Sequence, residues 1–175
     1  ESDARGTKHG LALRLFGYIP SGILIAVFCF VALKKFQPSK LTKVGFYGLG
    51  VFYGIATIFS GIFPCDVGCN KNFIDPSISQ IIHNLAGLLT YIFVPISVMI
   101  VGLGLRHSPS HNRLPVIAIT CGIVSSLFVS LSFSDLSSQY VGLLQRIIES
   151  IFLIWIASCA IEIKNMRTKN VSPTG

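Results

Sequence analysis

Arg146 and Glu149 lie inside a long apolar segment, where an unpaired charge is costly. They are three residues apart, so on a helix they share one face and can form an ion pair. Arg146 could instead bind a carboxylate or a phosphate through two parallel hydrogen bonds, and Glu149 could act as a base or a proton carrier. The two residues therefore predict either a structural ion pair or part of a ligand site.

Other polar side chains occur near the corresponding ends of neighbouring apolar segments. Asp66 closes the second segment, His83 is one turn inside the third, and Asp135 closes the fourth. The opposite halves of these segments contain no comparable set, so we expect a shared polar pocket that faces the extracytoplasmic side. The predicted ligand-binding or polar-cluster residues are Asp66, His83, Asp135, Gln145, Arg146 and Glu149.

His83 also has a purely structural interpretation, because a histidine in a membrane helix can simply hydrogen-bond a neighbouring helix. A haem held between two histidines is not expected from this sequence. His107, the next histidine, is 24 residues further on, which is about 36 Å along a helix. No metal and no cofactor are predicted, and the sequence leaves open whether the chain is an enzyme.

The stretch Phe63–Asn70, FPCDVGCN, places two cysteines four residues apart at the end of an apolar segment. Thiols on the extracytoplasmic side of a membrane are readily oxidised, and Gly68 would help the chain to turn between them. A Cys65–Cys69 disulfide is the favoured interpretation. Two free thiols, or a metal site that adds Asp66 and His83, are the alternatives.

The elements that must position these residues are apolar helices. The 175 residues are 51% hydrophobic and only 12% charged, whereas soluble domains carry about 25% charged residues. A helix needs about 20 apolar residues to cross a bilayer, and lipid requires every backbone polar group to be paired internally. The sequence therefore predicts an all-α, polytopic transmembrane helix bundle that forms a single membrane domain over residues 1–175. The expected helices are about 15–33, 45–64, 79–105, 115–133 and 140–161.

Local patterns refine these helices. Gly50 and Gly54 have the small-xxx-small spacing that lets two helices approach closely. Asp75 is predicted to be the N-cap of the third helix, with Pro76 at its first position. Pro95 is expected to kink the same helix.

The net charge of +7 indicates topology rather than a nucleic-acid partner. The basic residues concentrate in the first loop, the third loop and the tail, which all lie on one side of a five-helix chain. By the positive-inside rule that side is cytoplasmic, so the C-terminus is expected in the cytoplasm and residue 1 outside. The predicted partners are membrane lipids, with a small polar ligand and a homodimer left open.

Several short motifs resemble the DUF998 family of uncharacterised bacterial and archaeal membrane proteins. They are GIFPCD at the end of the second helix, IIHNLAG in the third, FSD after the fourth, and GLLQRIIESIFLIWI in the fifth. The resemblance covers nearly the whole chain and implies a six-helix protein of the cytoplasmic membrane, whose first helix would precede Glu1. The paired cysteines depart from the usual pattern of the family, and the family name implies no reaction.

A weaker analogy is to intramembrane metal-dependent hydrolases of the ceramidase and adiponectin-receptor kind. Those enzymes hold zinc with several histidines, whereas only His83 is available inside a helix here, which argues against zinc hydrolysis. Three functions follow from the sequence. The first is binding or transport of a small polar molecule or lipid headgroup. The second is an intramembrane lipid-modifying enzyme that uses Asp66, His83 and Asp135 as acids and bases. The third is a structural or partner-binding membrane protein.

Overall fold

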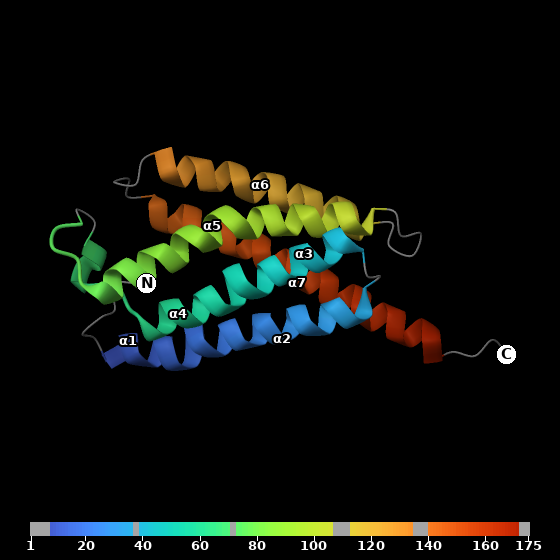
Figure 1. Ribbon diagram of the computed structural model, residues 1–175, viewed down its shortest axis with the longest axis horizontal. Coiled ribbons are helices and arrows are strands. Elements are labelled where there is room, and N and C mark those ends of the chain that lie inside the picture. The colour runs from blue at the N-terminus through green and yellow to red at the C-terminus, as the bar shows by residue number, and fades with distance from the viewer. Residues whose placement is uncertain (1–7, 37–38, 71–72, 107–112, 135–139, 172–175) are drawn as a thin grey trace. The chain divides into compact units, whose positions relative to one another are not determined.

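The computed structural model describes residues 8–36, 39–70, 73–106, 113–134 and 140–171, and these contain helices and loops but no strand. Figure 1 shows the order of the elements along the chain. The helical elements are α1 (Lys8–Leu13), η2 (Arg14–Tyr18), α2 (Ile19–Lys35), α3 (Lys40–Leu49), η3 (Gly50–Ile55), α4 (Ala56–Ile62), η4 (Val67–Asn70), α5 (Ile78–Leu105), α6 (Leu114–Ser134) and α7 (Val141–Val171). The predicted all-α class is therefore confirmed.

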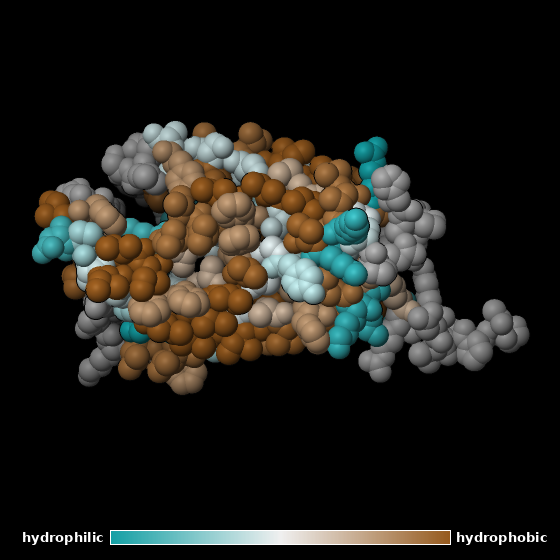
Figure 2. All heavy atoms as spheres, viewed as in Figure 1, coloured by the Kyte–Doolittle hydropathy of each residue, from teal (hydrophilic) through white to brown (hydrophobic). Residues whose placement is uncertain are grey.

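Within the described residues, four helical segments are long and apolar enough to cross a membrane. They are Gly10–Lys35, Lys40–Ile62, Ile78–Leu105 and Leu114–Ser134. The fifth predicted span corresponds to α7, which carries Arg146 and Glu149 and is not among these four. Apolar residues cover much of the face drawn in Figure 2. Large exposed side chains such as Phe16, at 83% exposure, are readily accommodated when lipid is the solvent.

The first and last helical segments are longer than the sequence predicts. Helical structure begins at Lys8 rather than near residue 15, and α7 continues to Val171 rather than ending near residue 161. Both extensions carry charged residues, such as Arg14 in the first and Glu162 and Lys164 in the second. A helix can nevertheless continue beyond the hydrocarbon, because its backbone groups remain paired within the helix.

The chain divides into two compact units. The first comprises Glu1–Cys29 with Gly48–Val94, and the second comprises Phe30–Tyr47 with Pro95–Gly175. Each unit therefore combines segments that are far apart in the sequence, and each is described in turn.

In the first unit, glycines let α2 approach the second helical segment. A Cβ atom at Gly22 would lie 2.6 Å from the Gly54 carbonyl oxygen, and one at Gly54 would lie 3.0 Å from the Ala26 nitrogen. A Cβ at Gly50 would make only an ordinary contact with Cys29, at 3.6 Å. Of the two glycines in the predicted small-xxx-small pair, Gly54 is the one that a larger residue could not replace without displacing its neighbours.

Two π-helical segments, η2 and η3, interrupt the first two spans. Such segments change the pairing of backbone carbonyls and often occur at functional sites. In η3 the Phe52 carbonyl oxygen accepts a hydrogen bond from the Thr90 hydroxyl of α5, at 2.7 Å. The rings of Phe52 and Phe93 stack with their centroids 4.5 Å apart. These contacts join α5 to the second span within the first unit.

In the second unit, glycines of α5 allow close packing on both α3 and α6. A Cβ at Gly104 would lie 2.6 Å from the Thr42 nitrogen in α3, and one at Gly102 would lie 2.8 Å from the Ala118 Cβ in α6. The α3 helix is capped by the Ser39 hydroxyl oxygen, which accepts a hydrogen bond from the Thr42 N–H at 3.0 Å. Trp155 of α7 is fully buried. This unit therefore has a packed interior of its own.

Candidate functional site

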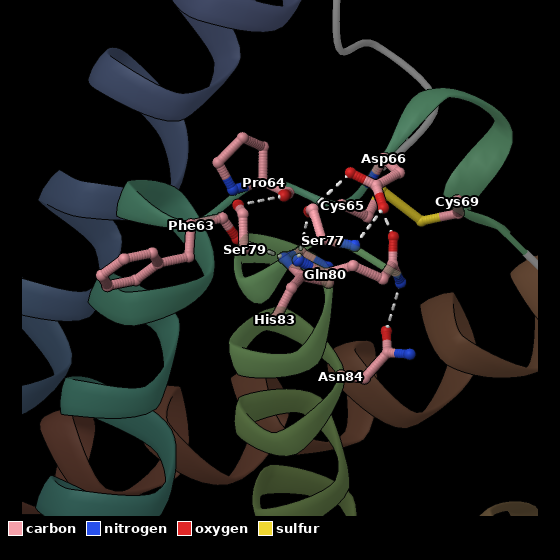
Figure 3. Close-up of a disulfide and its surroundings, with 10 residues drawn as sticks. All are labelled: Phe63, Pro64, Cys65, Asp66, Cys69, Ser77, Ser79, Gln80, His83 and Asn84. Carbon is pink, nitrogen blue, oxygen red and sulfur yellow. Dashed lines mark hydrogen bonds between the residues drawn. A yellow bond between two sulfur atoms is a disulfide. The ribbon is translucent and has the colours of Figure 1, made fainter. Parts of the chain in front are cut away.

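The connection between α4 and α5 contains a group of polar contacts in the first unit, and Figure 3 shows those around the disulfide. Cys65 and Cys69 form a disulfide there, with their Cα atoms 5.1 Å apart, so the favoured interpretation of the CxxxC pattern is confirmed. Gly68 and Cys69 have φ angles of 69° and 54°. The turn thus uses the left-handed region, where glycine is favoured.

Asp66 caps the start of α5 from a position eleven residues upstream. One carboxylate oxygen accepts a hydrogen bond from the Ser77 backbone N–H at 3.0 Å, and the other accepts from the Ser77 hydroxyl at 2.6 Å. The Ser77 hydroxyl oxygen in turn accepts from the Gln80 backbone N–H at 3.1 Å. Ser77 is therefore the N-cap of α5. The prediction that Asp75 is the N-cap is wrong, because Asp75 has a φ of 45° and precedes the cap.

Gln80 completes this network and is fully buried. Its side-chain oxygen accepts a hydrogen bond from the Asp66 backbone N–H at 2.6 Å, and its amide nitrogen donates to the Asn84 side-chain oxygen at 2.8 Å. In an ordinary capping box the residue at the Gln80 position reaches back to the cap residue's own N–H. Here Asp66 accepts from that N–H, and Gln80 binds Asp66.

His83 faces the end of α4. Its Nδ1 atom lies 3.0 Å from the Phe63 carbonyl oxygen, and because a carbonyl can only accept, Nδ1 must carry the hydrogen. In the neutral imidazole this fixes the tautomer, and Nε2 then presents a lone pair. Among the described residues no hydrogen-bond partner is found for Nε2. The half-buried ring is therefore oriented by the backbone and keeps one acceptor available.

Asn84 follows on the adjacent face of α5 and is exposed. Because its side-chain oxygen accepts from Gln80, its amide nitrogen is directed elsewhere, with two hydrogens to donate. Asn84, Gln80 and Ser77 are not among the site residues predicted from the sequence. The pattern Ser77-x-x-Gln80 is a capping-box signature that could have identified two of them.

Arg14 holds the opposite side of the same connection. Its Nε atom donates to the Gly61 carbonyl oxygen at 2.7 Å, and its Nη2 atom donates to the Ile62 carbonyl oxygen at 3.0 Å. These are terminal carbonyls of α4, which have no partner within the helix, and a cation is favourable at a helix C-terminus. Arg14 is therefore a cap of the α4 C-terminus.

The remaining predicted residues belong to the second unit. Gln145 and Arg146 are exposed and Glu149 is half-buried on α7, and the Arg146 Nη1 atom donates to the Gly142 carbonyl oxygen at 3.4 Å. Asp135 lies outside the described residues. The Arg146–Glu149 ion pair and the pocket shared by all six residues stay predictions. In the part of the chain that the structure describes, no group of three His, Cys, Asp or Glu side chains is placed to hold a metal ion.

A family model described as a protein of unknown function (DUF998) matches residues 2–162. Comparison with curated proteins found no match, and comparison with solved structures found none.

Proposed function

The chain belongs to the DUF998 family, and we propose that it is an integral membrane protein that binds a small polar molecule or a lipid headgroup at the extracytoplasmic ends of its helices. The observation that supports this function best is the orientation of His83. The Phe63 carbonyl holds Nδ1 and so presents the Nε2 lone pair as an acceptor. The proposed setting is the cytoplasmic membrane of a bacterium or archaeon, with the C-terminus inside and residue 1 outside.

The chemistry of these atoms narrows the ligand class. A lone pair on Nε2 accepts a hydrogen from a hydroxyl or an ammonium group. The amide nitrogen of Asn84, on the neighbouring face of α5, can donate to a phosphate, carbonyl or hydroxyl oxygen of the ligand. Ethanolamine and glycerol headgroups combine a donor with phosphate oxygens, whereas free ethanolamine or glycerol carries the donor without the phosphate. Comparing the lipids with the free molecules distinguishes these two sources.

The capping network supports the proposal by separating structure from binding. The Asp66 carboxylate is occupied by Ser77, and Gln80 is occupied by Asp66 and Asn84. Asp66, Ser77 and Gln80 fix the connection between α4 and α5. His83 has one nitrogen in that framework and a second that is available to a ligand.

The test compares two substitutions at His83 in the full purified chain. Thermal unfolding is measured with short-chain phosphatidylethanolamine, short-chain phosphatidylglycerol, free ethanolamine and free glycerol, since a ligand that binds only the folded state raises the midpoint. His83→Asn keeps a side-chain N–H for the Phe63 carbonyl but has no equivalent of Nε2. His83→Ala removes both. We expect His83→Asn to fold like the wild type and to lose the ligand-induced shift.

A structural role for the polar residues is the second candidate, because Asp66, Ser77 and Gln80 satisfy one another. The same experiment separates the two. If no probe shifts the wild-type midpoint, or if His83→Asn keeps the full shift, the binding proposal is wrong and the structural role remains. Repeating the assay with Arg146→Ala tests the prediction that Arg146 contributes to ligand binding.

A further inference from the structure

Large apolar side chains are exposed in the connection between α4 and α5, which lies outside the spans, and at the first residue of α5. Val67 is 77% exposed, Phe73 50%, Ile74 72% and Ile78 76%. We call Val67, Phe73, Ile74 and Ile78 the apolar tip. A patch of this kind on a folded protein usually marks a contact with another molecule or with a membrane.

The backbone of the apolar tip is held firmly in this arrangement. Asn70 bonds Ile74 twice, through Nδ2 to the Ile74 carbonyl oxygen at 2.9 Å and through Oδ1 from the Ile74 N–H at 3.1 Å. The Phe73 N–H donates to the Asn70 carbonyl oxygen at 2.8 Å. The Cys65–Cys69 disulfide closes the preceding turn. The exposure of Ile74 and Phe73 therefore belongs to a braced loop.

Strained backbone conformations also indicate that the surrounding structure holds this loop in place. Asn70, Phe73 and Asp75 have φ angles of 37°, 52° and 45°. This left-handed region is unusual for a bulky residue such as phenylalanine. Strained conformations persist where the surrounding structure enforces them, and they concentrate at functional positions. The network around Asn70 supplies that enforcement.

The position of the apolar tip between two spans indicates which molecule covers it. The preceding span ends at Ile62 and the following span begins at Ile78, so the loop between them lies at a membrane surface. Exposed apolar residues continue from the tip along α5 at spacings of three and four, which marks one face of a helix. They are Ile78, Ile81, Leu85, Leu88 and Ile92. The apolar tip thus lies at one end of this exposed stripe of α5, as expected of a surface that faces lipid.

We propose that the apolar tip inserts into the boundary between headgroups and acyl chains and anchors the connection between α4 and α5 to the lipid surface. Apolar side chains at this level are stabilised by partial burial among the acyl chains. The disulfide and Asn70 hold the backbone so that the side chains are presented outward. The proposal is independent of whether His83 binds a ligand.

The test places a fluorescent reporter in the tip. The chain has one tryptophan, Trp155, which is fully buried, so Ile74→Trp adds a signal that can be measured against the wild type. The full chain is reconstituted in phosphatidylcholine and phosphatidylglycerol vesicles, with lipids brominated near the headgroup as one quencher and aqueous iodide as the other. Val67→Trp gives a second, independent reporter at an exposed position.

We expect the added fluorescence to be blue-shifted, quenched by the brominated lipids and protected from iodide. Quenching by iodide without quenching by lipid would place the tip in water and overturn the proposal. Protection from both quenchers would show that protein covers the tip, from a second copy or another partner, and would also overturn it. Cys65→Ala with Cys69→Ala is expected to reduce the lipid quenching of Ile74→Trp, and unchanged quenching would contradict the role of the brace.

Discussion

At the scale of single residues, one carboxylate determines how α5 begins. Asp66 accepts two hydrogen bonds from Ser77, and its own N–H is bound by the buried side chain of Gln80. Asp66, eleven positions upstream of Ser77, thus accepts the N–H bond that the Gln80 side chain would accept in an ordinary capping box. The arrangement fixes the first turn of α5 and therefore the position of His83, whose Nδ1 atom contacts the Phe63 carbonyl oxygen.

Asp66→Asn is predicted to lower the stability of the folded chain. An amide offers only one acceptor oxygen, so one of the two bonds from Ser77 is lost and two donors are brought together. The expected loss is about 1–2 kcal/mol in the free energy of unfolding. Asp75→Asn is the matched control, because Asp75 is exposed and asparagine tolerates its φ of 45°. Equal thermal midpoints for the two variants would refute the capping role.

At the scale of elements, close packing and cross-linking hold the first unit together. Gly22 and Gly54 let α2 approach the second span, the Thr90 hydroxyl binds a carbonyl of η3, and Arg14 caps α4. Each contact joins segments that are distant in the sequence. The position of the α4–α5 connection therefore depends on contacts made along the whole length of these helices.

Two glycine-to-alanine changes should have opposite effects. A Cβ at Gly22 would lie 2.6 Å from both the Gly54 oxygen and an Ile58 side-chain carbon, so Gly22→Ala should destabilise by about 1–3 kcal/mol through overpacking. A Cβ at Gly87 would meet nothing within 4 Å, so Gly87→Ala should stabilise α5 by about 0.5–1 kcal/mol. Thermal unfolding of the two variants checks both signs, and a harmless Gly22→Ala would contradict the close approach.

The disulfide should contribute modestly because it closes a short loop. Reduction of the wild type is expected to lower the free energy of unfolding by about 2 kcal/mol in the chain-entropy model. The variant with Cys65→Ala and Cys69→Ala should not respond to the reductant, which isolates the effect of this pair from that of the other three cysteines. Alkylation of all five cysteines without reductant would show that the bond is absent.

The sequence predicts local features of the connection better than distant ones. The CxxxC spacing and Gly68 predict the disulfide from a few neighbouring residues. The prediction of Asp75 as the cap fails because Pro76 favours Asp75 locally, whereas the deciding contact comes from Asp66. Arg14 acts on carbonyls 47 and 48 residues away. Such a pairing arises from tertiary packing and has no local pattern.

At the scale of the whole molecule, the composition indicates that lipid surrounds the helices. The distribution of charge predicts the orientation of the chain in the membrane. Long apolar segments predict the helical class, which the structure confirms, because lipid leaves a backbone few alternatives to the helix. The π-helical segments η2 and η3 have no comparable signal, since they depend on packing. Whether Arg146 and Glu149 share a pocket with His83 stays a prediction, because no pattern within one helix determines which helices meet.

The proposed orientation makes a prediction about the C-terminus. A fluorescent protein that matures only in the cytoplasm, fused after Gly175, should be bright, since the tail carries Lys164, Arg167 and Lys169. A reporter that requires the extracytoplasmic side, fused at the same position, should be inactive. The reverse pair of signals would place the α4–α5 connection in the cytoplasm and contradict the proposed site.

Native mass spectrometry of the gently purified chain, comparing the wild type with His83→Asn, tests ligand binding at His83 directly. We expect the wild type to retain a polar adduct or a lipid of one headgroup class, and the variant to lose it while its thermal midpoint stays the same. The same adduct in both proteins, at the same occupancy, would contradict the claim that the Nε2 atom of His83 binds a ligand.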